Sequence, residues 1–192
     1  MTLRAASSRP ARGLSLIELI LFIVVVSAAL AGVLRVFIQA GSASADPQAQ
    51  RQAVAIAESL MQEVQLMPLT FCDPDDANVE TATSAAVGVN GCASQAEAIG
   101  PEAGETRFAS PQFDNVNDYD GYVMANGIKD ISNTAIVGLE AYSASVTVVP
   151  ANLGSIPATG DALLITVTVT GPHGVQVVLA GYRTRYAPNA AL

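Results

Sequence analysis

The chain of 192 residues is poor in aromatic side chains and in basic charge. It has no tryptophan, and the aromatic residues together make up 5% of it. Because aromatic side chains bury the largest areas, we expect a small core built mostly of valine, isoleucine, leucine and alanine. Nine lysine and arginine residues are outnumbered by 17 aspartates and glutamates, which gives a formal charge of −8. Nucleic-acid binding needs clustered basic side chains, so this balance argues against a nucleic-acid partner.

Histidine is nearly absent as well, which limits the chemistry that the chain could perform. The one histidine, His173, falls in a turn predicted at residues 171–174. A serine or cysteine nucleophile would therefore have no imidazole base, and no glycine-rich phosphate loop follows a predicted strand. We expect neither an enzyme nor a cofactor.

The two cysteines, Cys72 and Cys92, both lie in a polar, loop-like stretch. In an oxidising compartment such a pair indicates a disulfide that closes a loop, which contributes on the order of 3 kcal/mol. A metal site is the competing interpretation, but it would have only two thiols and a histidine far along the chain. The cysteines thus favour a disulfide in a domain exposed outside the cytoplasm.

In contrast to this polar stretch, residues 14–41 are apolar on all faces of a predicted helix. Residues 19–34 carry no charge, and the long stem of Arg35 can reach the far headgroups of a membrane. Glu18 is the one carboxylate within the apolar run. A charged side chain at the centre of a membrane helix costs about 2.5–3.5 kcal/mol on insertion scales, so Glu18 is expected to have a partner and a function.

Residues 1–13 form a short polar leader that contains Arg4, Arg9 and Arg12 and no acid. The positive-inside rule keeps this leader in the cytoplasm and translocates the residues beyond the apolar run. A secretory signal peptide and a plain single-pass anchor are the alternatives, but the run is too long for the first and neither explains Glu18. Loss of the leader would leave six basic against 17 acidic side chains, a formal charge of −11.

The motif Gly-Leu-Ser-Leu-Ile-Glu at residues 13–18 resembles the prepilin signal of type IV pilins and type II secretion pseudopilins, usually Gly-Phe-Thr-Leu-Ile-Glu. The resemblance implies that a prepilin peptidase cuts between Gly13 and Leu14 and methylates the new N-terminus. It also implies that Glu18 acts in assembly. Because an unpaired carboxylate in an apolar core is costly, the free amine of a neighbouring subunit is its expected partner.

A second helical pattern covers residues 46–67 and would continue the first. Asp46 is its expected N-cap, Pro47 falls in its first turn, and Pro68 ends it. Apolar residues recur at three- and four-residue spacing and predict one buried stripe of Ala49, Ala53, Ile56, Ala57, Leu60, Val64 and Met67.

The remainder, residues 68–192, is predicted to form a β-rich domain outside the membrane. Residues 70–116 indicate loops, with a short helix near residues 94–99. Beyond them the apolar period changes to two, which predicts an antiparallel sheet of strands over residues 122–124, 141–149, 162–170 and 175–186, the last two joined as a hairpin. The expected fold class is α+β, a small antiparallel sheet packed on the second half of a long N-terminal helix.

Two groups of loop acids, at residues 73–78 and 114–121, have oxygen ligands at a spacing that suits Ca²⁺. The weak calcium candidates are Asp114, Asp118 and Asp120. Neither group matches an EF-hand loop, so solvated or turn-capping acids are the preferred interpretation and no metal is predicted.

The segment Phe-Asp-Asn-Val-Asn-Asp-Tyr-Asp-Gly at residues 113–121 resembles part of the MshD-type minor pilins of mannose-sensitive haemagglutinin pili. The PilV-like and GspI-like minor subunits share the helix pattern. The resemblance implies a structural subunit of a type IV pilus, held in the inner membrane with a periplasmic C-terminal domain before it enters a filament that serves adhesion, motility, DNA uptake or secretion. Its implied partners are the prepilin peptidase, other pilin subunits and the pilus assembly platform. A type II secretion pseudopilin and a tip-displayed adhesive subunit are the alternatives.

Overall fold

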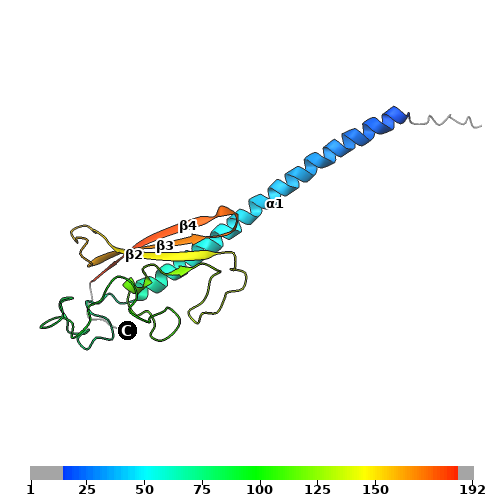
Figure 1. Cartoon of the computed structure of the whole chain (residues 1–192). Helices are drawn as coiled ribbons and strands as arrows, with labels where there is room; N and C mark the ends of the chain where they lie inside the picture. Colours follow the sequence, from blue (N-terminus) through cyan, green and yellow to red (C-terminus); the bar gives the residue numbers. More distant parts are fainter. Residues whose placement is uncertain (1–14, 186–192) are drawn as a thin grey trace, which may run out of the picture. The chain divides into compact units, whose positions relative to one another are not determined.

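The computed structural model of the chain describes residues 15–185, and the side chains of all of these except residues 39–46. The chain divides into two compact units, Met1–Ala45 and Asp46–Leu192. The elements within the described range, several of them labelled in Figure 1, are α1 (Leu16–Leu66), η1 (Asn117–Tyr119), β1 (Val123–Met124), β2 (Ser143–Pro150), β3 (Ala162–Thr170), η2 (Pro172–Gly174) and β4 (Gln176–Thr184).

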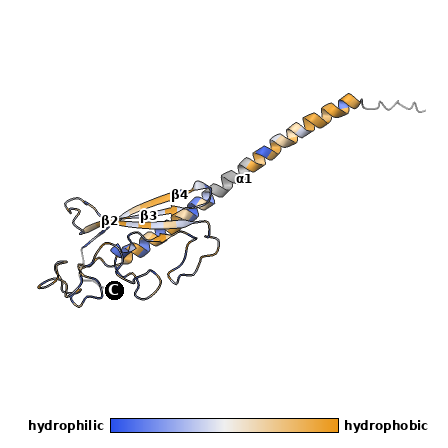
Figure 2. Ribbon diagram, viewed as in Figure 1, coloured by the Kyte–Doolittle hydropathy of each residue, from blue (hydrophilic) through white to orange (hydrophobic). Residues whose placement is uncertain are grey.

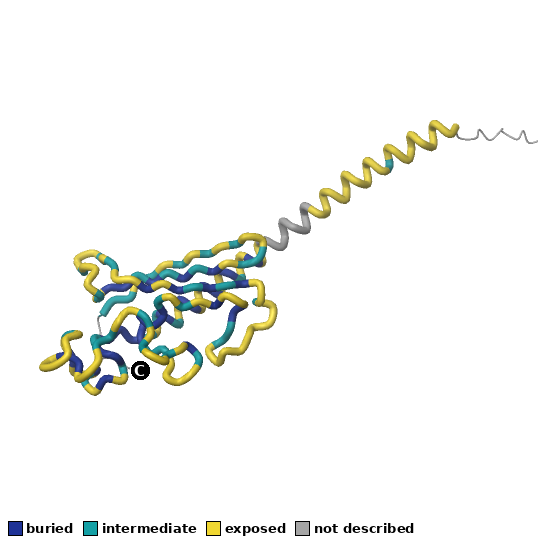
Figure 3. Tube along the Cα trace, viewed as in Figure 1, coloured by how far each residue is buried: buried dark blue, intermediate teal, exposed yellow. Residues whose placement is uncertain are grey.

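The first unit contains an apolar segment of α1, Leu16–Ile38 (Figure 2), which is long and apolar enough to cross a membrane by length and composition. Its 23 residues rise by about 35 Å, compared with a hydrocarbon core of about 30 Å. The residues of this segment are mostly exposed (Figure 3). Val26 alone among them is half-buried. An apolar surface of this extent needs lipid or another protein to cover it.

The backbone of α1 is helical through residues 41–47, where the sequence predicted a new helix start with Asp46 as N-cap. Pro47 lies inside the helix instead of in a first turn. Extending an existing helix adds a hydrogen bond for each residue that it orders, whereas a new helix needs a costly nucleus. Continuation is therefore cheaper than a restart, even with the one N–H that proline lacks, and the predicted N-cap at Asp46 is wrong.

In the second unit, the predicted apolar stripe of α1 forms the helix side of the core. All of its members are buried except Met67, which is partly buried, and Met61 joins them although the stripe omitted it. Gly181 of β4 lies close to this part of the helix. A Cβ atom at Gly181 would lie 3.2 Å from the Met61 sulfur and 2.6 Å from Gln65 Nε2, so β4 has no room for a side chain there.

The strands form one antiparallel sheet in the order β1-β2-β3-β4. The predicted hairpin is present as β3 and β4, and the strand ends differ from the predicted ones by at most two residues. On β3 the predicted alternation is confirmed, with Leu163, Ile165, Val167 and Val169 all buried. These side chains pack with the α1 stripe, Val116, Tyr119 and Tyr142 in the main core. A helix packed on an antiparallel sheet is the expected α+β arrangement.

The connection from α1 to β1 consists of loops, as predicted, but the short helix expected near residues 94–99 is not formed. Ala96 pairs with Cys72 as an isolated bridge, and the Glu97 N–H donates to the Phe71 carbonyl oxygen at 3.1 Å. These backbone groups therefore bond to a distant loop instead of within a helical turn.

Candidate functional site

Glu18 lies in the first turn of α1, on the apolar segment. Its backbone N–H donates to the Ser15 carbonyl oxygen at 3.0 Å, and its side chain is exposed. A helix N-terminus favours a carboxylate by about 0.3–1 kcal/mol, which is small beside the cost of placing it in lipid. Glu18 forms no ion pair with another residue in the range 15–185. Gly13 and Leu14, the predicted processing residues, lie outside the described residues.

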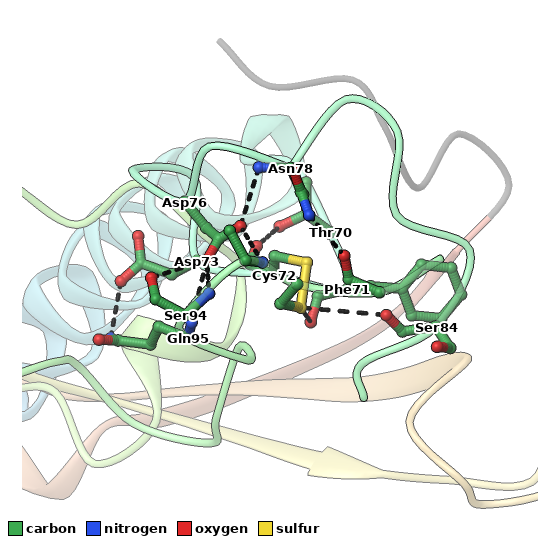
Figure 4. Close-up of a disulfide and its surroundings, with 12 residues drawn as sticks. Thr70, Phe71, Cys72, Asp73, Asp76, Asn78, Ser84, Ser94 and Gln95 are labelled. Carbon is green, nitrogen blue, oxygen red and sulfur yellow. Dashed lines mark hydrogen bonds between the residues drawn. A yellow bond between two sulfur atoms is a disulfide. The ribbon is translucent and has the colours of Figure 1, made fainter. Parts of the chain in front are cut away.

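A disulfide joins Cys72 to Cys92, which confirms the predicted pairing (Figure 4). The two Cα atoms are 5.4 Å apart, and both cysteines are buried in a small apolar cluster with Ala82, separate from the main core. The competing metal site is wrong, because both sulfurs are used in the covalent bond.

Asp76 holds the disulfide-bonded loop together through its carboxylate (Figure 4). Its Oδ1 accepts hydrogen bonds from the N–H groups of Asn78 at 2.9 Å and Ala93 at 2.8 Å. Its Oδ2 accepts from the N–H groups of Ser94 at 2.7 Å and Gln95 at 2.9 Å, and from the Ser94 hydroxyl at 3.0 Å. The Gln95 bond, with the other donors, holds the pKa of Asp76 well below its usual range. No pattern in the sequence indicated this role.

Three carboxylates from separate loop positions, Glu97, Glu102 and Asp118, converge in what we call the acid cluster. One oxygen of each lies within 4.8 Å of the others. Asp118 is fully buried, whereas Glu97 and Glu102 are half-buried. A second acid group of Asp73, Asp75 and Asp114 meets the same distance limit, and its Asp75 is exposed.

Residues in and beside η1 position the acid cluster. Oδ2 of Asp118 accepts hydrogen bonds from the N–H groups of Asp114 at 2.9 Å and Asn115 at 2.7 Å. The Asn117 carbonyl oxygen accepts from the Gly100 N–H at 3.0 Å. These bonds fix the orientation of Asp118 and hold beside it the loop that carries the other two acids.

Several oxygens of the acid cluster are buried without a hydrogen-bond partner among residues 15–185, namely Oδ1 of Asp118, both side-chain oxygens of Glu97 and Oε2 of Glu102. Burial raises the pKa of Glu97 to about 9, and the negative charges of Asp118 and Glu102 contribute to the rise. Burial also raises the pKa of Asp118 to about 7, against the lowering effect of its two N–H donors, and raises the pKa of Glu102. Together the three acids are costly to ionise unless a cation compensates them.

The three weak calcium candidates from the sequence have separate surroundings. Asp118 is fully buried, so the interpretation as a solvated acid is wrong for it, although its Oδ2 does cap a turn. Asp114 belongs to the second acid group. Asp120 belongs to neither group, and its Oδ1 accepts a hydrogen bond from the Val148 N–H of β2 at 2.9 Å.

Sequence reasoning missed the two glutamates of the acid cluster, since they lie in a different loop that has no periodic pattern.

A buried ion pair between Arg107 and Glu63 ties the loop region to α1. Arg107 Nε and Nη2 contact the two carboxylate oxygens of Glu63 at 2.6 and 2.7 Å. The Tyr119 hydroxyl donates to Glu63 at 2.8 Å, and Arg107 Nη1 donates to the Lys129 carbonyl oxygen at 3.1 Å. These charges are mutually satisfied, which marks them as structural.

Comparisons of the chain with protein-family models, with curated proteins and with solved structures found no match. Function is therefore inferred from the apolar segment, the disulfide-bonded loops and the acid cluster themselves.

Proposed function

We propose that the chain is a minor pilin, a structural subunit that its N-terminal helix holds in a membrane and then carries into a filament. The observation that supports this most is Glu18, a single carboxylate in the first turn of an exposed, membrane-length apolar segment. An apolar helix of this kind is stable in lipid or among other apolar helices. A subunit whose apolar segment passes from lipid into contact with other apolar helices can assemble without exposing that segment to water.

The proposed mechanism follows from the cost of an unpaired charge. In lipid or in a filament core, the Glu18 carboxylate needs a positive partner. Cleavage after Gly13 would create a free amine at Leu14. This amine is a cation and lies shortly before Glu18 in the sequence of the same subunit. The amine of one subunit pairs with Glu18 of its neighbour and so sets the axial register of the two helices. The other apolar side chains of Leu16–Ile38 pack between subunits without specifying register.

The second unit is consistent with a location outside the cytoplasm. Its disulfide needs an oxidising compartment, and the basic leader at residues 1–13 would remain on the cytoplasmic side. We therefore propose a single-pass inner-membrane protein with a periplasmic domain. Its partners are prepilin peptidase, other pilin subunits and the assembly platform, and its role is structural, not enzymatic.

The assignment to the MshD-type minor pilins rests on residues 113–121, on the Asp46-Pro47 pair and on the alanine-rich helical stretch that ends at Pro68. A type II secretion pseudopilin would use Glu18 in the same way, so it is the second candidate. A tip-displayed adhesive subunit has no neighbour above it to supply an amine, and Glu18 argues weakly against that position.

Replacing Glu18 by valine tests the proposal, because it separates membrane insertion from assembly. The variant makes the apolar segment more apolar, so insertion is expected to be unharmed. Assembly is expected to fail, because the neighbour's amine becomes an unpaired charge. Glu18→Val should accumulate in the membrane fraction and be strongly depleted in sheared filaments. The matched control is Glu58→Gln, an exposed acid farther along α1, which should assemble like the unmodified chain. Filaments that contain Glu18→Val at the normal level would overturn the proposal.

A further inference from the structure

We infer that the acid cluster is a calcium site, in which carboxylate oxygens of Glu97, Glu102 and Asp118 bind one Ca²⁺ ion. The site is independent of the membrane segment. Its residues lie in the loop region that connects α1 to β1 and in η1.

The distances fit a single ion. Each of the three residues offers one oxygen, and these oxygens lie no more than 4.8 Å apart. Calcium binds oxygen ligands at about 2.3–2.6 Å, so two ligands on opposite sides of the ion are about 4.8 Å apart. One ion can therefore contact all three side chains with at most a small adjustment of the side chains. Ca²⁺ takes 6–8 oxygens in flexible geometry, and water can supply the remaining ligands.

The state of Asp118 is an independent indication of a ligand. Its exposed fraction is 0%, and Oδ2 is held by two backbone N–H groups while Oδ1 has no partner among residues 15–185. An orphaned buried carboxylate oxygen is costly, and most such atoms in proteins are bonded to a group, a water or an ion. Because Oδ1 belongs to a side chain that converges with two other acids, a cation satisfies all three at once.

Arg185 forms no ion pair with the acid cluster within the described range. It lines a cavity together with Glu97 and feels the charge of that residue, but its hydrogen bonds go to other groups. It donates to the carbonyl oxygens of Thr70 and Gly160, and its Nε lies 3.4 Å from Oδ1 of Asp161. Both side-chain oxygens of Glu97 remain without a hydrogen-bond partner in the described range. The described residues therefore place three carboxyl groups together whose ionisation a bound divalent cation would compensate.

A cavity adjoins one member of the acid cluster, Glu97. The cavity beside Glu97 has a volume of about 210 Å³ and is also lined by Asn117, whose buried Oδ1 has no partner among the described residues. A bound ion would tie the loop of Glu97 and Glu102 to η1, and η1 packs on the main core through Tyr119. Calcium binding is therefore expected to stabilise the second unit. Extracellular calcium modules bind with dissociation constants of about 10⁻⁴–10⁻³ M, and a site of three carboxylates falls in that range.

The test uses the full chain purified in detergent, treated with a chelator and titrated with CaCl₂ by calorimetry. One ion should bind for each chain, and Glu97→Gln, Glu102→Gln and Asp118→Asn should each weaken binding at least about 10-fold, since each variant removes a charged ligand. The matched controls are Glu80→Gln, an exposed acid outside both groups, and Asp75→Asn in the second acid group. Both controls should bind like the unmodified chain.

Thermal unfolding gives a second readout that a merely structural role would not produce. Without calcium, Glu97→Gln should melt at or above the temperature of the unmodified chain, because the amide replaces a carboxyl group that is costly to ionise beside Asp118 and Glu102. With 10 mM CaCl₂ the unmodified chain should gain roughly 3 °C or more and Glu97→Gln clearly less, because the ion is at about 10–100 times its dissociation constant for the first and much nearer to it for the second. Absence of bound calcium at 10 mM would overturn the site. The calcium site would also be overturned if the three cluster variants bound calcium normally, or if Asp75→Asn lost as much affinity as they do.

Discussion

Arg107 and Glu63 form a two-pronged ion pair between positions 44 apart in the chain, with contacts of 2.6 and 2.7 Å. The side chain of Arg107 is 6% exposed and that of Glu63 is 22% exposed, so the arginine is buried and the glutamate half-buried. The paired geometry matches the fork of the guanidinium to the two oxygens of the carboxylate. The pair fixes where the loop region contacts α1, and with it the orientation of Tyr119 beside the acid cluster.

Removal of one partner of this pair should be strongly destabilising. Arg107→Met leaves the half-buried Glu63 carboxylate with only the Tyr119 donor, and we expect such a change to cost about 2–3 kcal/mol. Urea unfolding followed by circular dichroism measures the loss. The matched control is Arg51→Met, an exposed arginine on α1, which should stay within about 0.5 kcal/mol of the unmodified chain. A loss from Arg107→Met no larger than that of the control would contradict the structural role of the pair.

Loss of the disulfide should destabilise the second unit without affecting the membrane segment. The bond joins Cys72 and Cys92, which are 20 positions apart in the sequence, and so closes a loop. Its removal in Cys72→Ser should cost on the order of 3 kcal/mol of folding stability. Alkylation without reductant should leave both thiols of the exported chain unlabelled. Rapid labelling of both cysteines would show that the bond is absent in solution, and Cys72→Ser would then unfold like the unmodified chain.

Asp76 should make the stability of the disulfide-bonded loop depend on pH in the acidic range. Its pKa in the folded chain is below the ordinary value of 3.8, because the N–H donor of Gln95 and the other donors favour the charged form. The folded state therefore binds fewer protons than the unfolded state as pH falls. The contribution is fully present above about pH 4 and is lost as pH falls towards the folded pKa. Asp76→Asn should be destabilised at pH 7 and should approach the unmodified chain near pH 2.

The measurement for Asp76 is urea unfolding at a series of pH values from 7 to 2. Asp120→Asn is a suitable control, because Asp120 also accepts a backbone N–H but lies outside the disulfide-bonded loop. A difference between Asp76→Asn and the unmodified chain that stays constant over this range would contradict the linkage.

Processing at the N-terminus is expected to remove residues 1–13. Intact mass of the protein from membranes should show a chain that begins at Leu14 and carries an added methyl group. Gly13→Val should block the cut, because a side chain at the cleavage position hinders the peptidase, and the leader should remain attached. A chain that begins after Ala31 or Ala40 would indicate ordinary signal peptidase and would contradict the pilin proposal.

The sequence predicted best those elements in which apolar residues recur at a regular spacing. The apolar segment, the α1 stripe and the β3–β4 hairpin repeat every few residues, so their buried faces can be identified without knowledge of the fold. The disulfide was predictable because the chain has only two cysteines. Local reasoning failed at Asp46, where the preceding helix simply continues, and at residues 94–99, where the loop of Phe71 and Cys72 takes the backbone hydrogen bonds.

Local patterns were sufficient to predict a membrane-length helix with one carboxylate, an amphipathic continuation and an antiparallel sheet, because each depends on side chains close together in the chain. The folded structure was needed to show that Asp76 anchors the loop of the disulfide, that Arg107 meets Glu63 and that Glu97, Glu102 and Asp118 converge. Those groups come from loops without periodicity, so no short stretch of residues encodes their proximity. Their surroundings depend on burial and on charges brought together from distant positions, which exist only once the chain has folded.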